Sequence, residues 1–300
     1  MAVTEIKATI PVCSYGNIQP TITCENYEDG MKELLALATS LGSGASEFAK
    51  SINVSAQKDE ATQSASQSLR KKVCFGDDCV YFDEDSHTYS TEDGRQLLSG
   101  STFAHKFEKE FPRLPVAQKA AEKRGVDTQV ILDGWDSKGE VSLMWGSTIH
   151  KAIETKIKFG EDVNDSYLKA LVDDLMEQQG ESEMFSEVFV CDKELGLCGF
   201  IDCLVHLDGK DCEIYDWKTG DIFKRTSLTD EAKELFPDLV QKTVSLYYLQ
   251  LNFYRYILER KGYNVVGMKI WALSGEHWSP VEVPKMDITK ALESVWEFKK

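Results

Sequence analysis

The sequence predicts a mixed α/β fold in which a helix precedes three strands, a second helix and a fourth strand. Three observations lead to this order. Two apolar runs flank the Asp-Gly turn at 208–209, which is typical of a β-hairpin, and a third run at 185–191 precedes them. Residues 239–261 have the apolar content of a buried helix and end before Gly262, a residue that commonly follows a helix. A further strand pattern follows at 265–273.

Composition and charge are those of a globular protein. The chain has 300 residues, 42% of them hydrophobic, and no apolar run approaches the roughly 20 residues that span a bilayer. The N-terminus lacks the basic and apolar blocks of a secretory signal, so we expect a cytoplasmic protein with no membrane partner. The formal charge is 34 − 50 = −16. This acidity argues against a protein that coats nucleic acid through bulk charge, but it allows an enzyme with a local basic groove.

The eight cysteines lack the spacing of a metal site. None of them forms a CxxC pair, so we expect no zinc. A cytosolic location favours reduced and mostly buried thiols. We therefore expect Cys74 and Cys79 to be free, and also Cys203 and Cys212, which flank the hairpin turn.

The chain is expected to fall into three segments. Residues 1–47 form a small α+β unit of unknown role, with two short β-like runs and a helix at 28–41. Residues 48–71 have the Ser-, Gly- and Gln-rich composition of a linker. Residues 72–300 hold the main domain. Because the first unit is too small for a large core, we expect it to dock elsewhere, a protein partner being one option.

The main domain is expected to open with a β-meander that ends at helix-cap residues near Ser99. A helix with His150 and Glu154 on one face is expected to begin at the cap residue Ser147. The remaining expected elements are helices at 115–124, 127–138 and 167–179, a polar segment at 222–238 that is partly loop, a short strand at 281–283 and a final helix at 288–299.

The chemistry of the chain concentrates on the hairpin. Asp202 lies in an otherwise apolar strand, where a carboxylate is costly unless it is paired or binds a cation. Asp216 and Lys218 are two residues apart on the next strand and therefore share a face. These carboxylates and the backbone carbonyl of Trp217 suit one or two Mg²⁺ ions, and an imidazole from His150 suits Mn²⁺ somewhat better. We expect desolvation to lower the pKa of Lys218, which would then orient or deprotonate a water for phosphodiester hydrolysis.

Two motifs on this hairpin resemble the core of the PD-(D/E)XK nuclease superfamily. They are GFID at 199–202 and DWKTG at 216–220. The likeness covers about residues 72–300, and four further features make it similar to the RecB-like exonuclease branch, in part to phage-encoded members. These features are GSTIH at 146–150 with Glu154, Glu187 on the preceding strand, Gln250 with Tyr254, and the lead-in at 83–102.

The resemblance implies a restriction-endonuclease-like core with added helices, and metal-dependent cleavage of DNA with Mg²⁺ or Mn²⁺. The histidine motif implies an exonuclease. This enzyme would act in the recombination, repair or processing of phage DNA in the cytoplasm of the host. The roles that it implies are metal binding by His150, Asp202 and Asp216, catalysis by Lys218 with both aspartates, an auxiliary acid at Glu187, and DNA contact or bracing by Gln250 and Tyr254.

The sequence departs from the RecB-like pattern in its cysteines, and two functions other than an exonuclease stay open. Some RecB-like relatives bind an iron–sulfur cluster through one cysteine before the core and three after it. No cysteine follows Cys212 here, so we expect no cluster. A structure-specific or nicking endonuclease stays open as an alternative. So does a nuclease-fold binding module without activity, although the intact Asp202, Asp216 and Lys218 argue against it.

Overall fold

The computed structural model describes residues 4–7, 10–13, 16–18, 21–24, 70–180 and 182–296. The chain divides into two compact units, Met1–Gln67 and Ser68–Lys300. The helix expected at 28–41 and residues 48–69 of the expected linker lie outside the described residues. The first unit contains the antiparallel pairs β1 (Thr4–Lys7) with β4 (Thr21–Cys24) and β2 (Ile10–Cys13) with β3 (Gly16–Ile18), which confirms its two β-like runs.

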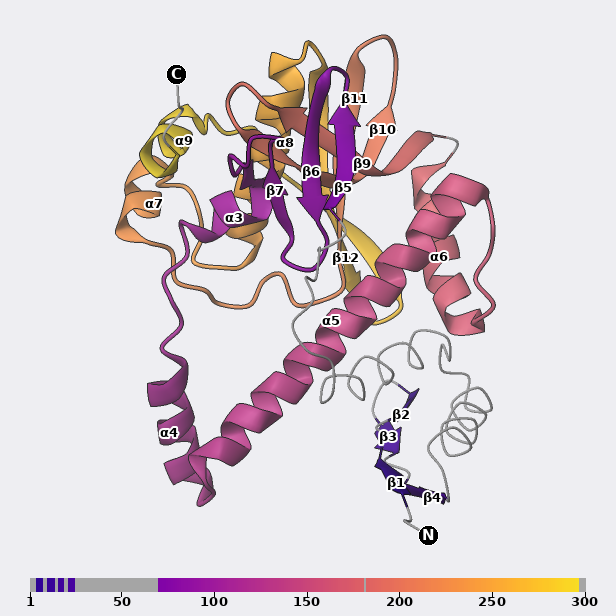
Figure 1. Cartoon of the computed structure of the whole chain (residues 1–300), viewed down its shortest axis with the longest axis vertical. Coiled ribbons are helices and arrows are strands. Elements are labelled where there is room, and N and C mark those ends of the chain that lie inside the picture. Colours follow the sequence, from indigo (N-terminus) through magenta and orange to yellow (C-terminus); the bar gives the residue numbers. More distant parts are fainter. Residues whose placement is uncertain are drawn as a thin grey trace. The chain divides into compact units, whose positions relative to one another are not determined.

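The second unit is built on a mixed sheet that has six strands within the described residues (Figure 1). Its strands are β13 (His277–Glu282), β12 (Asn264–Ser274), β11 (Asp211–Lys218), β10 (Leu197–His206) and β8 (Leu98–Ser99), in this order, with β9 (Glu183–Asp192) paired to β10. The β10–β11 hairpin is antiparallel, whereas β11 and β12 are parallel and joined by a helical crossover. The predicted order of helix, three strands, helix and strand is confirmed.

Helices cover both faces of this sheet. Helix α8 (Val244–Arg260) packs in one apolar cluster, and α5 (Thr128–Phe159) with α6 (Ser166–Gln179) packs in a second. Ile214 and Tyr215 are consecutive in β11 and belong to different clusters, so the two clusters lie on opposite faces of the strand. We call them the α8 cluster and the α5–α6 cluster.

Helix α5 differs from the prediction. We expected a break before a new helix at Ser147, but one helix runs unbroken through Thr128–Phe159. It is capped by Asp127, whose carboxylate accepts the Gln129 amide at 2.7 Å. The glycines inside it lower helix propensity by about 1 kcal/mol each, but a glycine keeps its backbone hydrogen bonds, so it does not end a helix that packing supports. The first half of α5 extends beyond the sheet (Figure 1).

The other described helices are short or peripheral. They are α3 (Gly100–His105), α4 (Arg113–Arg124), α7 (Asp230–Leu235) and α9 (Thr289–Val295). Helix α4 packs through Ala117 and Ala121 against Ile131 in the extended half of α5. Among the described helices, none is long and apolar enough to cross a membrane.

A separate antiparallel sheet precedes these helices. It consists of β5 (Arg70–Phe75), β6 (Asp78–Asp83) and β7 (Thr88–Ser90), the meander that the sequence predicted. Cys74 faces Cys79 across the first two strands, and the two form a disulfide, which corrects the expectation of free thiols. The pairing follows from the strand register, which cysteine spacing alone does not reveal. Cys203 and Cys212 are free and buried as expected, but they belong to different clusters and lie on opposite faces.

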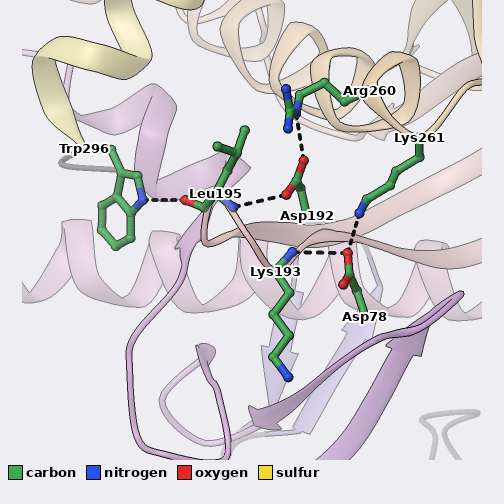
Figure 2. A network of polar contacts seen from close by, with 7 residues as sticks. All are labelled: Asp78, Asp192, Lys193, Leu195, Arg260, Lys261 and Trp296. Carbon is green, nitrogen blue, oxygen red and sulfur yellow. Dashed lines mark hydrogen bonds and ion pairs between the residues drawn. The ribbon is translucent and has the colours of Figure 1, made fainter. Parts of the chain in front are cut away.

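Charged side chains join this small sheet to the main one (Figure 2). The Asp78 carboxylate in β6 lies 2.5 Å from Lys261 Nζ and accepts the Lys193 amide at 3.2 Å. Asp192, at the end of β9, is 2% exposed and pairs with Arg260 Nε at 2.8 Å. Arg260 and Lys261 are adjacent at the C-terminal end of the long helix α8. The two ion pairs therefore attach the small sheet and the end of β9 to the same end of this helix.

Candidate active site

The β10–β11 hairpin places two aspartates and a lysine together. Asp216 is 3% exposed, and its Oδ2 lies 2.6 Å from Lys218 Nζ, so the two residues share a face as predicted. Asp202 stands on the neighbouring strand, where its Oδ2 accepts the Trp217 amide at 2.9 Å. The backbone hydrogen bond fixes the carboxylate of Asp202 beside the strand that carries Asp216 and Lys218.

Helix α5 brings His150 to the same place. Its Nε2 lies 2.9 Å from the carbonyl oxygen of Trp217, and its Nδ1 lies 3.6 Å from Asp202 Oδ2. A carbonyl oxygen only accepts, so Nε2 carries the hydrogen and, in the neutral ring, Nδ1 presents its lone pair toward Asp202. The Trp217 carbonyl, which we expected to bind a metal, therefore orients the imidazole; whether it also reaches a metal stays a prediction.

Glu187 completes a group of possible metal ligands. Ile201 pairs with Val188 and Cys203 with Ser186, so Glu187 stands opposite Asp202. Each of His150, Glu187 and Asp202 offers one ligand atom, and these atoms lie within 4.8 Å of one another. We call these three residues the metal group. Two carboxylates and an imidazole fit a hard or borderline divalent cation such as Mg²⁺ or Mn²⁺.

Both strands change face at Glu187 and Asp202. Ile201 packs in the α8 cluster and Cys203 in the α5–α6 cluster, although strand residues two apart normally share a face. Glu187 has a φ of 53°, a left-handed conformation that costs a non-glycine residue roughly 1–2 kcal/mol. Backbone strain of this kind concentrates at functional sites, where the surrounding structure holds it.

Burial and like charges perturb the carboxylates. Burial, with Asp202 nearby, raises the pKa of Glu187 to about 7. Burial also raises the pKa of Asp216, against the opposing effect of Lys218. Such crowding of desolvated acids is typical of functional sites and is relieved by a bound cation.

The pKa of Lys218 is raised, whereas we expected it to be lowered. Burial lowers the pKa of its ammonium, but Asp216 and Asp202 raise it by more, and the net pKa lies above its ordinary value. Its Nζ also lies 4.8 Å from the centre of the Tyr247 ring, a favourable place for a cation. Lys218 is therefore held as a cation in this structure. The sequence analysis missed Tyr247, although it lies three residues before Gln250 on the same helix face.

Gln250 and Tyr254 contact each other in α8, and the Tyr254 ring lies against Gly199 of β10. Gln250 Nε2 donates to the Tyr254 hydroxyl at 3.3 Å, and the Tyr254 ring is 5% exposed. A Cβ atom at Gly100 or Gly199 would lie within 2.8 Å and 2.7 Å, respectively, of Tyr254 Cε1. The ring thus packs on two bare glycine backbones, one of them in the GFID motif. We expected Tyr254 either to contact DNA or to brace the site, and the burial of its ring favours the second role.

Comparison with known proteins agrees with this geometry. No curated protein matches the chain. The family model described as PD-(D/E)XK nuclease superfamily matches residues 102–297, a span that runs from α3 past α9 and contains the whole metal group. The mixed sheet flanked by helices is consistent with the restriction-endonuclease-like fold of that family. The chain belongs to the PD-(D/E)XK nuclease superfamily.

Proposed function

We propose that the protein is a Mg²⁺- or Mn²⁺-dependent DNA exonuclease of the RecB-like type, which processes DNA ends in recombination, repair or DNA processing of a phage in its host's cytoplasm. The observation that carries the nuclease proposal is the metal group, whose donor atoms lie within 4.8 Å of one another beside a lysine–aspartate pair. The exonuclease choice rests on the likeness of 146–150 to the RecB-like histidine motif, because His150 is a member of that group.

The chain's residues take the following parts. His150, Glu187 and Asp202 would hold the cation, with Asp216 completing the acidic surroundings. A bound divalent cation supplies Lewis-acid polarisation of the phosphodiester and lowers the pKa of water. Asp202 is held by the Trp217 amide and His150 by the Trp217 carbonyl, so the backbone of one residue fixes the direction of two ligands.

Lys218 acts in this proposal through its charge. Because the neighbouring carboxylates raise its pKa in the metal-free protein, Lys218 is an ammonium before the cation binds. A positive charge fixed beside the scissile phosphate stabilises the negative charge that develops during hydrolysis. Asp216 holds that ammonium in place through its 2.6 Å contact.

The test uses the full-length protein on linear and covalently closed circular DNA, with Mg²⁺ or Mn²⁺ and with EDTA. We expect loss of the linear form alone, and none with EDTA. Asp202→Asn should lower the rate at least about a hundredfold, as loss of a group that stabilises transition-state charge does. Asp208→Asn, an exposed aspartate in the turn of the same hairpin, is the matched control and should keep the wild-type rate.

Each contrary result has a definite meaning. Cutting of the circular form indicates an endonuclease and refutes the exonuclease proposal. No cutting with either metal indicates a binding module. Mn²⁺ binding by calorimetry gives a readout that is independent of turnover, and equal Mn²⁺ affinity of wild type and Asp202→Asn would remove the metal assignment.

A further inference from the structure

A pocket of about 500 Å³ opens beside the metal group. This volume lies within the range of roughly 300–1,000 Å³ that is usual for small-ligand sites. The small sheet β5–β7 supplies one side of the pocket, and α5, β9 and β10 supply others. Glu187 belongs both to its lining and to the metal group, so a ligand in the pocket lies next to the metal ligands.

Aromatic side chains make up much of the wall. Phe82, His87, Tyr89 and Phe200 all line the pocket. The Phe82 ring centre lies 4.8 Å from that of Tyr89, 5.5 Å from that of Phe200 and 5.8 Å from that of His87. Phe82 and Phe200 are half-buried and His87 is exposed, so faces or edges of these rings remain open to a ligand. Flat rings of this kind are the partners on which nucleic-acid bases stack.

The charges of the pocket favour a neutral group over a phosphate. Lys158 Nζ lies 2.8 Å from Glu154 and Lys71 Nζ lies 4.0 Å from Glu84, and all four residues line the pocket. Each of these lysines is thus opposed by a carboxylate. Glu187 adds a further acid, so the described lining offers a phosphate no net attraction. A neutral aromatic base meets no such penalty.

We infer that this pocket receives one unpaired base of the DNA strand whose phosphodiester lies at the metal group. The inference rests on the proposed nuclease function and narrows its substrate. A base inside an intact duplex is stacked and paired, so it reaches an aromatic pocket only after leaving the helix. Single-stranded or frayed DNA ends offer such a base without the cost of unpairing, so the enzyme favours them. The stacking is tolerant of sequence because every base has a flat aromatic face.

The test measures binding of a short single-stranded oligonucleotide that carries 2-aminopurine at one end, with the probe placed at either end in turn. Fluorescence titrations use the full-length protein with EDTA and with Ca²⁺. Phe82→Leu removes the ring and keeps an apolar side chain, and Tyr81→Leu, on the neighbouring position of β6 outside the pocket, is its control. His87→Asn removes the second ring and suits a φ of 51°, which asparagine tolerates. Thermal melts establish that each variant is folded.

We expect the wild type to quench the probe at one end, and Phe82→Leu or His87→Asn to weaken binding by about 5-fold or more, since base stacking on an aromatic ring contributes about 1–3 kcal/mol. An oligonucleotide with an abasic residue at that end, followed by the anisotropy of a dye on its other end, should bind wild type and both variants alike. No quenching in either buffer, or equal loss with Tyr81→Leu, overturns the inference. Hydrolysis of linear DNA by the wild type is scored separately, so a working nuclease with an unused pocket is distinguished from a protein that is no nuclease.

Discussion

Replacing Gly199 with alanine places a methyl group against the ring of Tyr254. The new Cβ would lie 2.7 Å from Tyr254 Cε1 and 3.2 Å from its hydroxyl oxygen, whereas carbon atoms in good contact are about 3.5–4.0 Å apart. The ring is 5% exposed and also packs on Gly100, so it has little room to move. Overpacking a core by a methyl group costs typically about 1–3 kcal/mol. We expect the upper part of that range, about 2–3 kcal/mol, because the ring is confined on both sides.

Urea unfolding followed by circular dichroism measures this change in the free energy of unfolding. Gly139→Ala is the matched control, because Gly139 lies exposed inside α5 and an added Cβ there has no neighbour within 4 Å. Alanine is the better helix former, so the control should be more stable than the wild type by about 0.5–1 kcal/mol. A Gly199→Ala variant as stable as the wild type would refute the steric reasoning.

A double-mutant cycle with Tyr254→Leu identifies the partner of the clash. Leucine lacks the ring atoms that the new methyl group would strike, so Gly199→Ala should cost less than about 1 kcal/mol in that background. If the two substitutions are additive, the cost of alanine at Gly199 arises elsewhere and Tyr254 is not held by the glycine.

Three further predictions concern buried charges. Lys218→Ala leaves Asp216 buried without its partner and should destabilise the metal-free protein by about 3 kcal/mol in urea unfolding, while the double change to Lys218→Met with Asp216→Leu should recover most of that loss. Asp192→Ala removes an acceptor that is 2% exposed and should lower the melting temperature by several degrees, whereas Glu194→Ala, exposed in the same turn, should not change it. Burial raises the pKa of Glu187 from 4.5 to about 7, so the native state holds this proton more tightly than the unfolded chain, and stability in EDTA should fall as pH rises from 4.5 to 7, by up to about 3 kcal/mol. Glu187→Gln should flatten that part of the stability curve, and an unchanged slope would contradict the shift.

Local sequence signals predicted the hairpin and the positions of its charged residues well. Asp216 and Lys218 share a face because they are two residues apart on one strand, and the register set by the Asp-Gly turn brings Asp202 beside them. The paired strands follow from this turn and its flanking apolar runs, and the crossover helix follows from its apolar content and the glycine after it. These signals report contacts between residues that are close in sequence or joined by a tight turn.

Features that depend on tertiary packing could not be predicted from the sequence. Glu187 was named as an auxiliary acid from the resemblance, but its left-handed backbone was not predicted, because no pattern marks glutamate for that conformation. The raised pKa of Lys218 follows from two nearby carboxylates outweighing burial, a balance that requires distances. The unbroken helix α5 and the Cys74–Cys79 disulfide depend likewise on packing and register.

The continuity of α5 makes its two ends parts of one rigid body. At about 1.5 Å per residue, the helix axis from Thr128 to His150 is about 33 Å long. Its far half packs against α4, whereas the half near His150 packs against the sheet through Ile149 and Ile153. A tilt of about 5° about the half near His150 displaces the far end by about 3 Å at this length. Because Ile149 and Ile153 hold this half of the helix in the core, His150 stays near the pivot of such a tilt, while α4 moves with the far end.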